Sequence, residues 1–457
     1  MFRKIPSVIT GTLYLSAAGI ITRFLGFFYK IWLGNLIGAE ELGIYQLVFP
    51  VFSICLSICG GPFQTAVSKF TAECQEHHPA KARYYLRISL LLAGTLAMLC
   101  TVFLLLFRRQ VAVYFLLNDR CEPLLTYIAL SIPLSAIHNC ITGWYYGQKK
   151  TAVPALSNLA EQGVRILFVF LLLQTDLEFT VIQVSWALLL GELVSVLSTS
   201  IACIFGQRKL RRLASCHVSS LDGSFCGKSC RGSVFNRPFS QNSFHEILQL
   251  IWPLSANRLI MSLLQSVESI MIPSRLILYG FSESTALSMY GTLTGMSLSF
   301  IMFPTALTGS FSLMLLPDIA KACSEHRIAY IRKASRLSLS ATFFMGCVFT
   351  AIFFLFGDAI GSLCFPGTLA GTYIRSLSWL CPFIYLNHIL MSILHGMGMT
   401  ALTFKTQLSG LILRLGVTVF LIPLYGINCY FLALLGSQVL MCGLNLHYLE
   451  HAPVMEP

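Results

Sequence analysis

Charged side chains inside apolar segments are the residues of this sequence best placed to do chemistry. The segment 8–33 carries Arg23 and Lys30, which are two helical turns apart and so lie on one face, roughly 10 Å apart along the axis. A charge at the bilayer centre costs about 2.5–3.5 kcal/mol on insertion scales, and this segment contains no acidic residue. We therefore expect a cationic stripe that faces a wet cavity and suits a pyrophosphate or another anionic group. In the alternative, Lys30 snorkels to the outer interface and only Arg23 is deep.

A second polar patch lies in the apolar segment 153–174, which contains Glu161, Gln162 and Arg165. The acid lies four residues before the base, the favourable order for an ion pair along a helix. Two interpretations stay open, a contact to substrate and a self-neutralised structural pair.

The segment 247–271 contains Arg258 and Glu268, which are too far apart along one helix to pair directly. We expect each of them to face the interface between the two halves of the chain. Arg258 is then a further candidate substrate contact, and Glu268 is a candidate proton or cation site. Glu192 and Arg414 also lie within apolar segments, and the sequence does not decide whether they are structural.

These charges are exceptional because the whole chain of 457 residues is apolar. Hydrophobic residues make up 56% and charged residues only 11%, with a mean hydropathy of +0.74, whereas soluble domains average about 25% charged residues. Apolar runs of about 20 residues match the thickness of a bilayer core. We predict an all-α integral membrane protein of about twelve spans. The spans lie near 8–33, 44–66, 85–107, 124–146, 153–174, 180–205, 247–271, 288–315, 334–356, 376–396, 405–424 and 427–447.

The charge balance agrees with this class. The chain has 31 basic against 19 acidic residues, a formal net charge of +12. With a cytoplasmic N-terminus, most basic residues fall in inner segments, above all in the stretch 206–245, as the positive-inside rule requires. We therefore predict that both termini are cytoplasmic, and no nucleic-acid partner is needed to explain the charge.

Six predicted spans precede the basic stretch and six follow it. Identities recur between the halves at one constant separation, at Pro133/Pro382, Gly147/Gly396, Thr151/Thr400 and Arg165/Arg414. An even number of spans gives both halves the same orientation, so a pseudo-two-fold axis along the membrane normal is expected. We predict a six-helix lobe at 1–205, a cytoplasmic linker at 206–245 and a six-helix lobe at 246–457, with the substrate path between the lobes.

Several features argue against an enzyme or an ATP-driven pump. The glycines of the segment 223–229 are spaced by three residues, where a phosphate loop needs four. Cys216, His217, Cys226 and Cys230 lack the paired spacing of a metal site. No other extramembrane stretch is long enough for a catalytic domain of the membrane-glycosyltransferase kind. We expect no ATP site, no metal and no cofactor.

Several motifs together resemble the stage V sporulation protein B group of the multidrug/oligosaccharidyl-lipid/polysaccharide (MOP) exporter superfamily, which also includes the MurJ lipid II flippases and the MATE drug exporters. The motifs are Ala17-Ala18-Gly19 through Arg23 to Lys30, Gly43-Ile-Tyr45-Gln46 with Pro50, Gly61-Pro62 with Ser68-Lys69, Glu161-Gln162 with Arg165, Ile272 to Leu276, and Tyr290-Gly291 with Phe303-Pro304. The resemblance covers residues 1 to about 447.

The resemblance implies a flippase of the bacterial cell membrane that works by alternating access. Its expected substrate is an undecaprenyl-pyrophosphate-linked saccharide or lipid II, moved to the outer leaflet in cell-wall, spore-cortex or polysaccharide biosynthesis. The family's basic first-span positions correspond to Arg23 and Lys30, and its polar fifth-span patch to Glu161, Gln162 and Arg165. Membrane lipids and a coupling ion, H+ or Na+, are further candidate partners. The alternative is a cation-coupled multidrug exporter of the MATE type, which would need acidic rather than basic cavity residues.

Overall fold

The structure is a computed structural model that describes residues 7–74, 79–174, 180–219 and 242–451, and it contains no strand within those ranges. The first half forms α1 (Ser7–Cys59), α2 (Gly61–Cys74), α3 (Pro79–Gln110), the π-helix η1 (Val111–Phe115), the 3-10 helix η2 (Asp119–Cys121), α4 (Glu122–Gly147), α5 (Ala152–Leu172) and α6 (Val181–Ser219). The second half forms α7 (Asn242–Tyr279), α8 (Glu283–Gly291), the π-helix η3 (Thr292–Ser297), α9 (Leu298–Met302), α10 (Thr305–Ser324), α11 (Ile328–Cys364), α12 (Ala370–Leu377), the 3-10 helix η4 (Ser378–Leu380), α13 (Cys381–Gly396), α14 (Thr400–Phe420), α15 (Ile422–Tyr425) and α16 (Asn428–Glu450).

The all-helical, multi-pass prediction is confirmed. In the described part of the chain, nine helical segments are long and apolar enough to cross a membrane, and one pair bent by 57°, Glu283–Met302 with Thr305–Ser324, makes ten. One of the nine, Gly19–Cys74, has 56 residues and would be about 80 Å long if straight, far more than a bilayer core of about 30 Å. It therefore covers both of the first two predicted spans. Counted as two spans, this segment brings the ten segments to eleven spans. The twelfth predicted span, 405–424, corresponds to α14, which is not among the ten segments.

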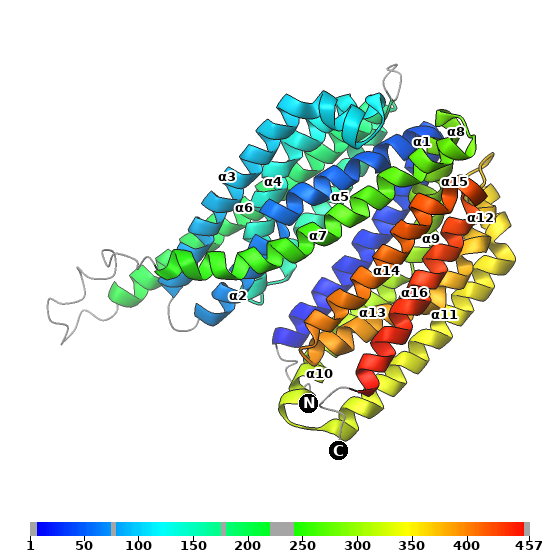
Figure 1. The fold of residues 1–457 in the computed structure, drawn as a ribbon. Helices are drawn as coiled ribbons and strands as arrows, with labels where there is room; N and C mark the ends of the chain where they lie inside the picture. The colour runs from blue at the N-terminus through cyan, green and yellow to red at the C-terminus, as the bar shows by residue number, and fades with distance from the viewer. Residues whose placement is uncertain (1–6, 75–78, 175–179, 220–241, 452–457) are drawn as a thin grey trace.

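The long first helix is bent at Gly38. This residue has φ 79° and ψ 173°, a conformation that favours glycine because a side chain would clash with the backbone. Figure 1 shows α1 running up beside the helices of the second half and, after the bend, returning along those of the first half. The bend therefore places Arg23 and the residues after Gly38 against different parts of the protein.

The helices gather into two bundles (Figure 1). In the first bundle α4 packs on α2, α3 and α6, and α5 packs on α6; in the second bundle α13 packs on α10, α11 and α16, and α14 packs on α16. Two long helices, α1 and α7, are shared between the bundles. Phe27 of α1 packs against Phe300 and Phe303 of the second half, whereas Ile247 and Ile251 of α7 belong to a buried cluster of the first half. The lobe division at 206–245 stays a prediction, because residues 220–241 lie outside the described part of the chain.

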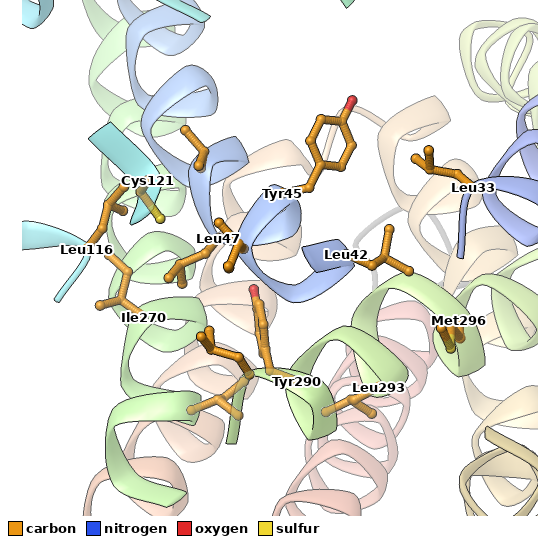
Figure 2. Close-up of a cluster of buried hydrophobic side chains, with 14 of the residues drawn as sticks. Leu33, Leu42, Tyr45, Leu47, Leu116, Cys121, Ile270, Tyr290, Leu293 and Met296 are labelled. Carbon is orange, nitrogen blue, oxygen red and sulfur yellow. The ribbon is translucent and has the colours of Figure 1, made fainter. Parts of the chain in front are cut away.

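At one end of the molecule the bundles are in tight contact. A Cβ on Gly43 of α1 would lie 2.3 Å from the Leu287 carbonyl oxygen, and a Cβ on Gly291 would lie 2.0 Å from the Ala39 carbonyl oxygen. Only glycine lets the two backbones cross so closely. Around the crossing, Figure 2 shows Leu42, Tyr45 and Leu47 of α1 beside Tyr290, Leu293 and Met296 of the second half. We call this contact the glycine crossing.

Polar contacts close the same end. Asn118 donates a hydrogen bond of 2.7 Å to the Glu283 carboxylate, and the Ser284 hydroxyl donates one of 2.5 Å to Glu40. Arg120 forms ion pairs with Glu40 and Glu41. Both hydrogen bonds join the first half of the chain to α8, so this end is sealed by polar as well as apolar groups.

Candidate functional site

Two cavities adjoin each other inside the protein. Both halves of the chain line the smaller one, whereas Arg23 is the one described residue of the first half that lines the larger. The larger has a volume of about 630 Å³ and is lined by side chains of α1, α7, α10, α13, α14 and α16. The smaller has a volume of about 530 Å³ and is lined by α1, α2, α4, α7 and α14. Met261 and Gln407 line both cavities, which therefore adjoin. The larger cavity reaches His395, at the end of α13 away from the glycine crossing, so it extends toward the end of the molecule where α1 begins and α16 ends (Figure 1).

Arg23 lines the larger cavity and reaches across to the second half. Its Nη1 donates a hydrogen bond of 2.9 Å to the Thr305 carbonyl oxygen at the start of α10. The guanidinium lies against Gly309, where a Cβ would be 2.9 Å from Nη1. The absence of a side chain at this glycine therefore makes room for the arginine.

Arg258 is placed in a reciprocal way. It lines the smaller cavity from α7, and its Nη2 donates a hydrogen bond of 3.4 Å to the Thr65 hydroxyl of α2. A Cβ on Gly61 would lie 1.7 Å from Nη1, so this glycine also makes room for a guanidinium. The first helix of each half thus carries an arginine that contacts the other half.

Lys30 does not share this environment. Its Nζ donates a hydrogen bond of 3.4 Å to the Ser299 hydroxyl of α9, and it is not among the lining residues of either cavity. Of the two cations expected to form a stripe on α1, Arg23 lines one of these two cavities and Lys30 lines neither. The role of Lys30 as a substrate contact stays a prediction.

The polar patch of α5 lies within the first bundle. Arg165 Nη2 is 2.6 Å from Glu161 and 3.1 Å from Glu192 of α6, and these side chains are mostly buried. Gln162 is buried against α1, with its Nε2 3.8 Å from where a Cβ on Gly26 would lie. None of the four residues lines either cavity. This geometry favours the structural interpretation of the patch.

Contrary to the expectation, Glu268 pairs within the second half rather than across the interface between the halves, and its role as a proton or cation site stays a prediction. Its carboxylate pairs with Arg414 of α14, with both Nε and Nη2 at 3.0 Å, and accepts a 2.9 Å hydrogen bond from the Tyr430 hydroxyl of α16. All three residues belong to the second half, in which α7 packs on α14. Arg414 also lines the larger cavity, so a paired cation contributes to its wall.

Uncharged polar side chains form much of the remaining wall of the larger cavity. Asn387 donates hydrogen bonds to Gln438 at 2.9 Å and accepts one from Asn445 at 3.4 Å. Amides of this kind both donate and accept hydrogen bonds, which suits hydroxyl-rich ligands. Asn387, Met391 and His395 recur every four residues and so share one helix face, a signal in the sequence that our interpretation missed.

The described residues include no group of three or more His, Cys, Asp or Glu side chains that could hold a metal ion. The stretch with Gly223, Cys226 and Cys230 lies outside the described part of the chain. Nothing at the cavities therefore argues for a metal.

Comparisons with known proteins agree with the resemblance. The family model described as "Polysaccharide biosynthesis protein" matches residues 8–306. Stage V sporulation protein B of Bacillus subtilis (strain 168) is 24% identical and covers 95% of this chain and 82% of its own length. Lipid II flippase MurJ of the same organism is 25% identical over 197 residues, 39% of this chain and 36% of the flippase.

The fold is also that of known transporters. The inward-facing structure of a multidrug resistance MATE family transporter of the MOP superfamily superposes with a TM-score of 0.70 at 15% identity, covering 95% of this chain and 97% of the transporter. At this identity the likeness shows the fold alone, and it confirms the predicted fold class. The chain belongs to the polysaccharide biosynthesis protein family, and it has the multi-pass helical fold of the MATE transporters.

Proposed function

We propose that this protein is a flippase that carries a lipid-linked saccharide with a phosphate or pyrophosphate group from the cytoplasmic to the outer leaflet by alternating access. The observation that carries the proposal is the reciprocal pair of arginines. Arg23 and Arg258 come from opposite halves, line adjoining cavities, and form no ion pair with a carboxylate of the described chain. Arginine is well suited to phosphate because its planar fork donates several hydrogen bonds at once.

The cavity walls argue against the alternative, an exporter of cationic drugs. The described lining of both cavities contains no aspartate or glutamate, whereas it contains three arginines, Arg23, Arg258 and Arg414. An organic cation entering this space would meet like charge. An anionic head group is attracted, and the amides of Asn387 and Gln438 offer hydrogen bonds to its sugar hydroxyls.

The relatives support the same substrate class. One similar protein is named as a lipid II flippase, and the matching family model is described by polysaccharide biosynthesis. The comparisons do not identify the glycan, so the proposal is limited to the class of anionic lipid-linked saccharides.

The proposed direction of transport rests on charge distribution. Most basic residues fall in the loops that share a membrane side with the termini, and the positive-inside rule assigns that side to the cytoplasm. The glycine crossing then lies at the outer side, and the larger cavity, which reaches His395, extends toward the cytoplasmic side. In the proposed transport cycle, this conformation is the inward-facing state before the substrate head group binds.

The test uses purified protein in liposomes that contain a fluorescent polyprenyl-diphosphate saccharide, with a membrane-impermeant reductant to quench the label in the outer leaflet. Losing a charge-assisted hydrogen bond removes about 1.5–3 kcal/mol, so we expect Arg23→Gln and Arg258→Gln each to slow translocation about tenfold or more. Lys69→Gln is the matched control, since this exposed lysine pairs only loosely with Glu73 at 3.9 Å. Wild-type translocation by the Arg23→Gln/Arg258→Gln double variant would overturn the proposal. Transport of a fluorescent organic cation by the unmodified protein, without precursor translocation, would favour the drug exporter.

Gly61→Val gives a separate check of the role of Arg258. The added side chain would occupy the position of the guanidinium, so we expect it to displace Arg258 from α2 and to slow translocation as much as Arg258→Gln does. Because both changes act on one contact, the double variant Gly61→Val/Arg258→Gln is expected to be no slower than either single variant. Gly94→Val is the control, as a Cβ there meets nothing within 4 Å. Additive slowing in the double variant would show that Gly61 acts independently of Arg258.

A further inference from the structure

A polar face of α11 lies away from the central cavities and is flanked by two hollows. Arg332, Arg336 and Ser340 follow one another at intervals of four residues, so they share one face of the helix. All three line both a groove of about 570 Å³ and a second hollow of about 540 Å³. We call the larger hollow the α11 groove. Its lining shares no residue with the two central cavities.

The α11 groove changes from charged to apolar along its length. Since α11 begins at Ile328, Arg332 and Arg336 lie only about 6 and 12 Å along the helix axis, near the depth of lipid head groups. Its other wall is apolar and comes from three helices. These residues are Leu339 and Phe343 of α11, Leu386 of α13, and Leu446 and Leu449 of α16. A molecule that fits must be anionic at one end and hydrocarbon at the other.

The charge at the mouth is strongly one-sided. Lys333 lines the second hollow beside the two arginines, and Glu450 is the one carboxylate among the described lining residues of both hollows. The positive-inside rule explains why cations gather at this end of a helix, but it does not require them to border an apolar groove. The position of these cations beside an apolar groove therefore indicates a ligand-binding site.

We propose that the α11 groove is a binding site for one anionic phospholipid of the bilayer. Its phosphate is held by Arg332 and Arg336, and one acyl chain lies along Phe343, Leu446 and Leu449 between α11 and α16. Both helices line this groove and both pack on α13, and Figure 1 shows them in the outer part of the second bundle. A membrane phospholipid reaches this position directly from its own leaflet, whereas a substrate moving between the halves does not pass it. The bound lipid would link α11 to α16 and stiffen the second bundle.

Native mass spectrometry of the full chain, exchanged into detergent with phosphatidylglycerol or phosphatidylcholine, tests this site without a transport assay. We expect the wild type to retain one phosphatidylglycerol molecule in preference to phosphatidylcholine. The double variant Arg332→Gln/Arg336→Gln is expected to bind it about tenfold more weakly or worse, as each basic residue near the surface contributes to anionic lipid affinity. Lys321→Gln is the matched control, because Lys321 is an exposed cation at the same end of the molecule. Equal retention of phosphatidylglycerol by the double variant would overturn the proposal.

A second variant separates the groove from the charges. Ser340→Trp places a bulky ring at an exposed position that lines both hollows and leaves Arg332 and Arg336 intact. We expect it to abolish retention of the phospholipid without lowering the unfolding temperature in lipid-free detergent. Displacement of the bound lipid by glycerol phosphate alone would show an anion site without a lipid groove, and retention of a polyprenyl diphosphate in preference to phosphatidylglycerol would assign the groove to substrate. Either result would reject the proposal while leaving the proposed transport function standing.

Discussion

Replacing Arg165 with methionine is expected to lower the free energy of unfolding by about 3–5 kcal/mol, the usual cost of removing one partner from a buried ion pair. Glu161 and Glu192 both contact the same nitrogen, Nη2, at 2.6 and 3.1 Å. Without the guanidinium, two largely buried carboxylates would face each other across a vacated space. The midpoint of denaturant unfolding in detergent, followed by intrinsic fluorescence, measures the effect.

Two comparisons make this prediction specific. The triple variant Arg165→Met/Glu161→Gln/Glu192→Gln is expected to recover most of the lost stability, because no uncompensated charge remains. Arg375→Met, which breaks an exposed ion pair with Asp358 at 3.2 Å, is expected to cost no more than about 1 kcal/mol. If Arg165→Met unfolds at the same midpoint as Arg375→Met, the cluster does not stabilise the first bundle.

Replacing Gly291 with leucine is expected to open the sealed end of the molecule. Its Cβ would lie 2.0 Å from the Ala39 carbonyl oxygen and 2.6 Å from the Gly43 nitrogen, which are backbone atoms that cannot rotate away. Overpacking of this kind typically costs 1–3 kcal/mol, so amide exchange at α8 and at residues 39–43 should accelerate about 10- to 100-fold. Hydrogen–deuterium exchange mass spectrometry measures this faster amide exchange directly and requires no label attached to a cysteine.

The control for this change is Gly163→Leu in α5, where a Cβ meets nothing within 4 Å. We expect unchanged exchange at α8 in that variant. We also expect Gly291→Leu to lose translocation, because an alternating-access transporter must close one side while the other is open. Normal exchange at α8 together with normal translocation would mean that the backbones do not cross as closely as 2.0 Å in the working protein.

The class of fold was predictable from the sequence because few backbone structures can satisfy all their hydrogen bonds inside a bilayer. Apolar runs that must satisfy their own backbone hydrogen bonds become helices, and so the multi-pass helical architecture follows from composition and run length. The bend at Gly38 was not predictable in detail, because a glycine in an apolar run is as often a site of helix packing as of a change in direction. Only the structure shows that the chain reverses there.

Among the charged residues, too, contacts within one helix were predictable and contacts between distant helices were not. The ion pair of Arg165 with Glu161 can be read from a spacing of four residues, since one helix fixes both positions. The partner of Glu268 cannot, because Arg414 is 146 residues away and the choice depends on how α7 packs on α14. Gly61 and Gly309 were missed as positioning residues for the same reason: their neighbours are arginines of distant helices.

The sharing of helices between the bundles has a consequence for synthesis of the protein in the cell. Arg23 meets its partner Thr305 only after 282 further residues have been made. At translation rates of about 5–20 residues per second, the first helix waits roughly 15–60 s in the membrane before α10 leaves the ribosome. During that interval Arg23 lacks its hydrogen bond to the Thr305 carbonyl oxygen. Early insertion of this helix therefore depends on the insertion machinery, lipid head groups or water that reaches the bilayer interior.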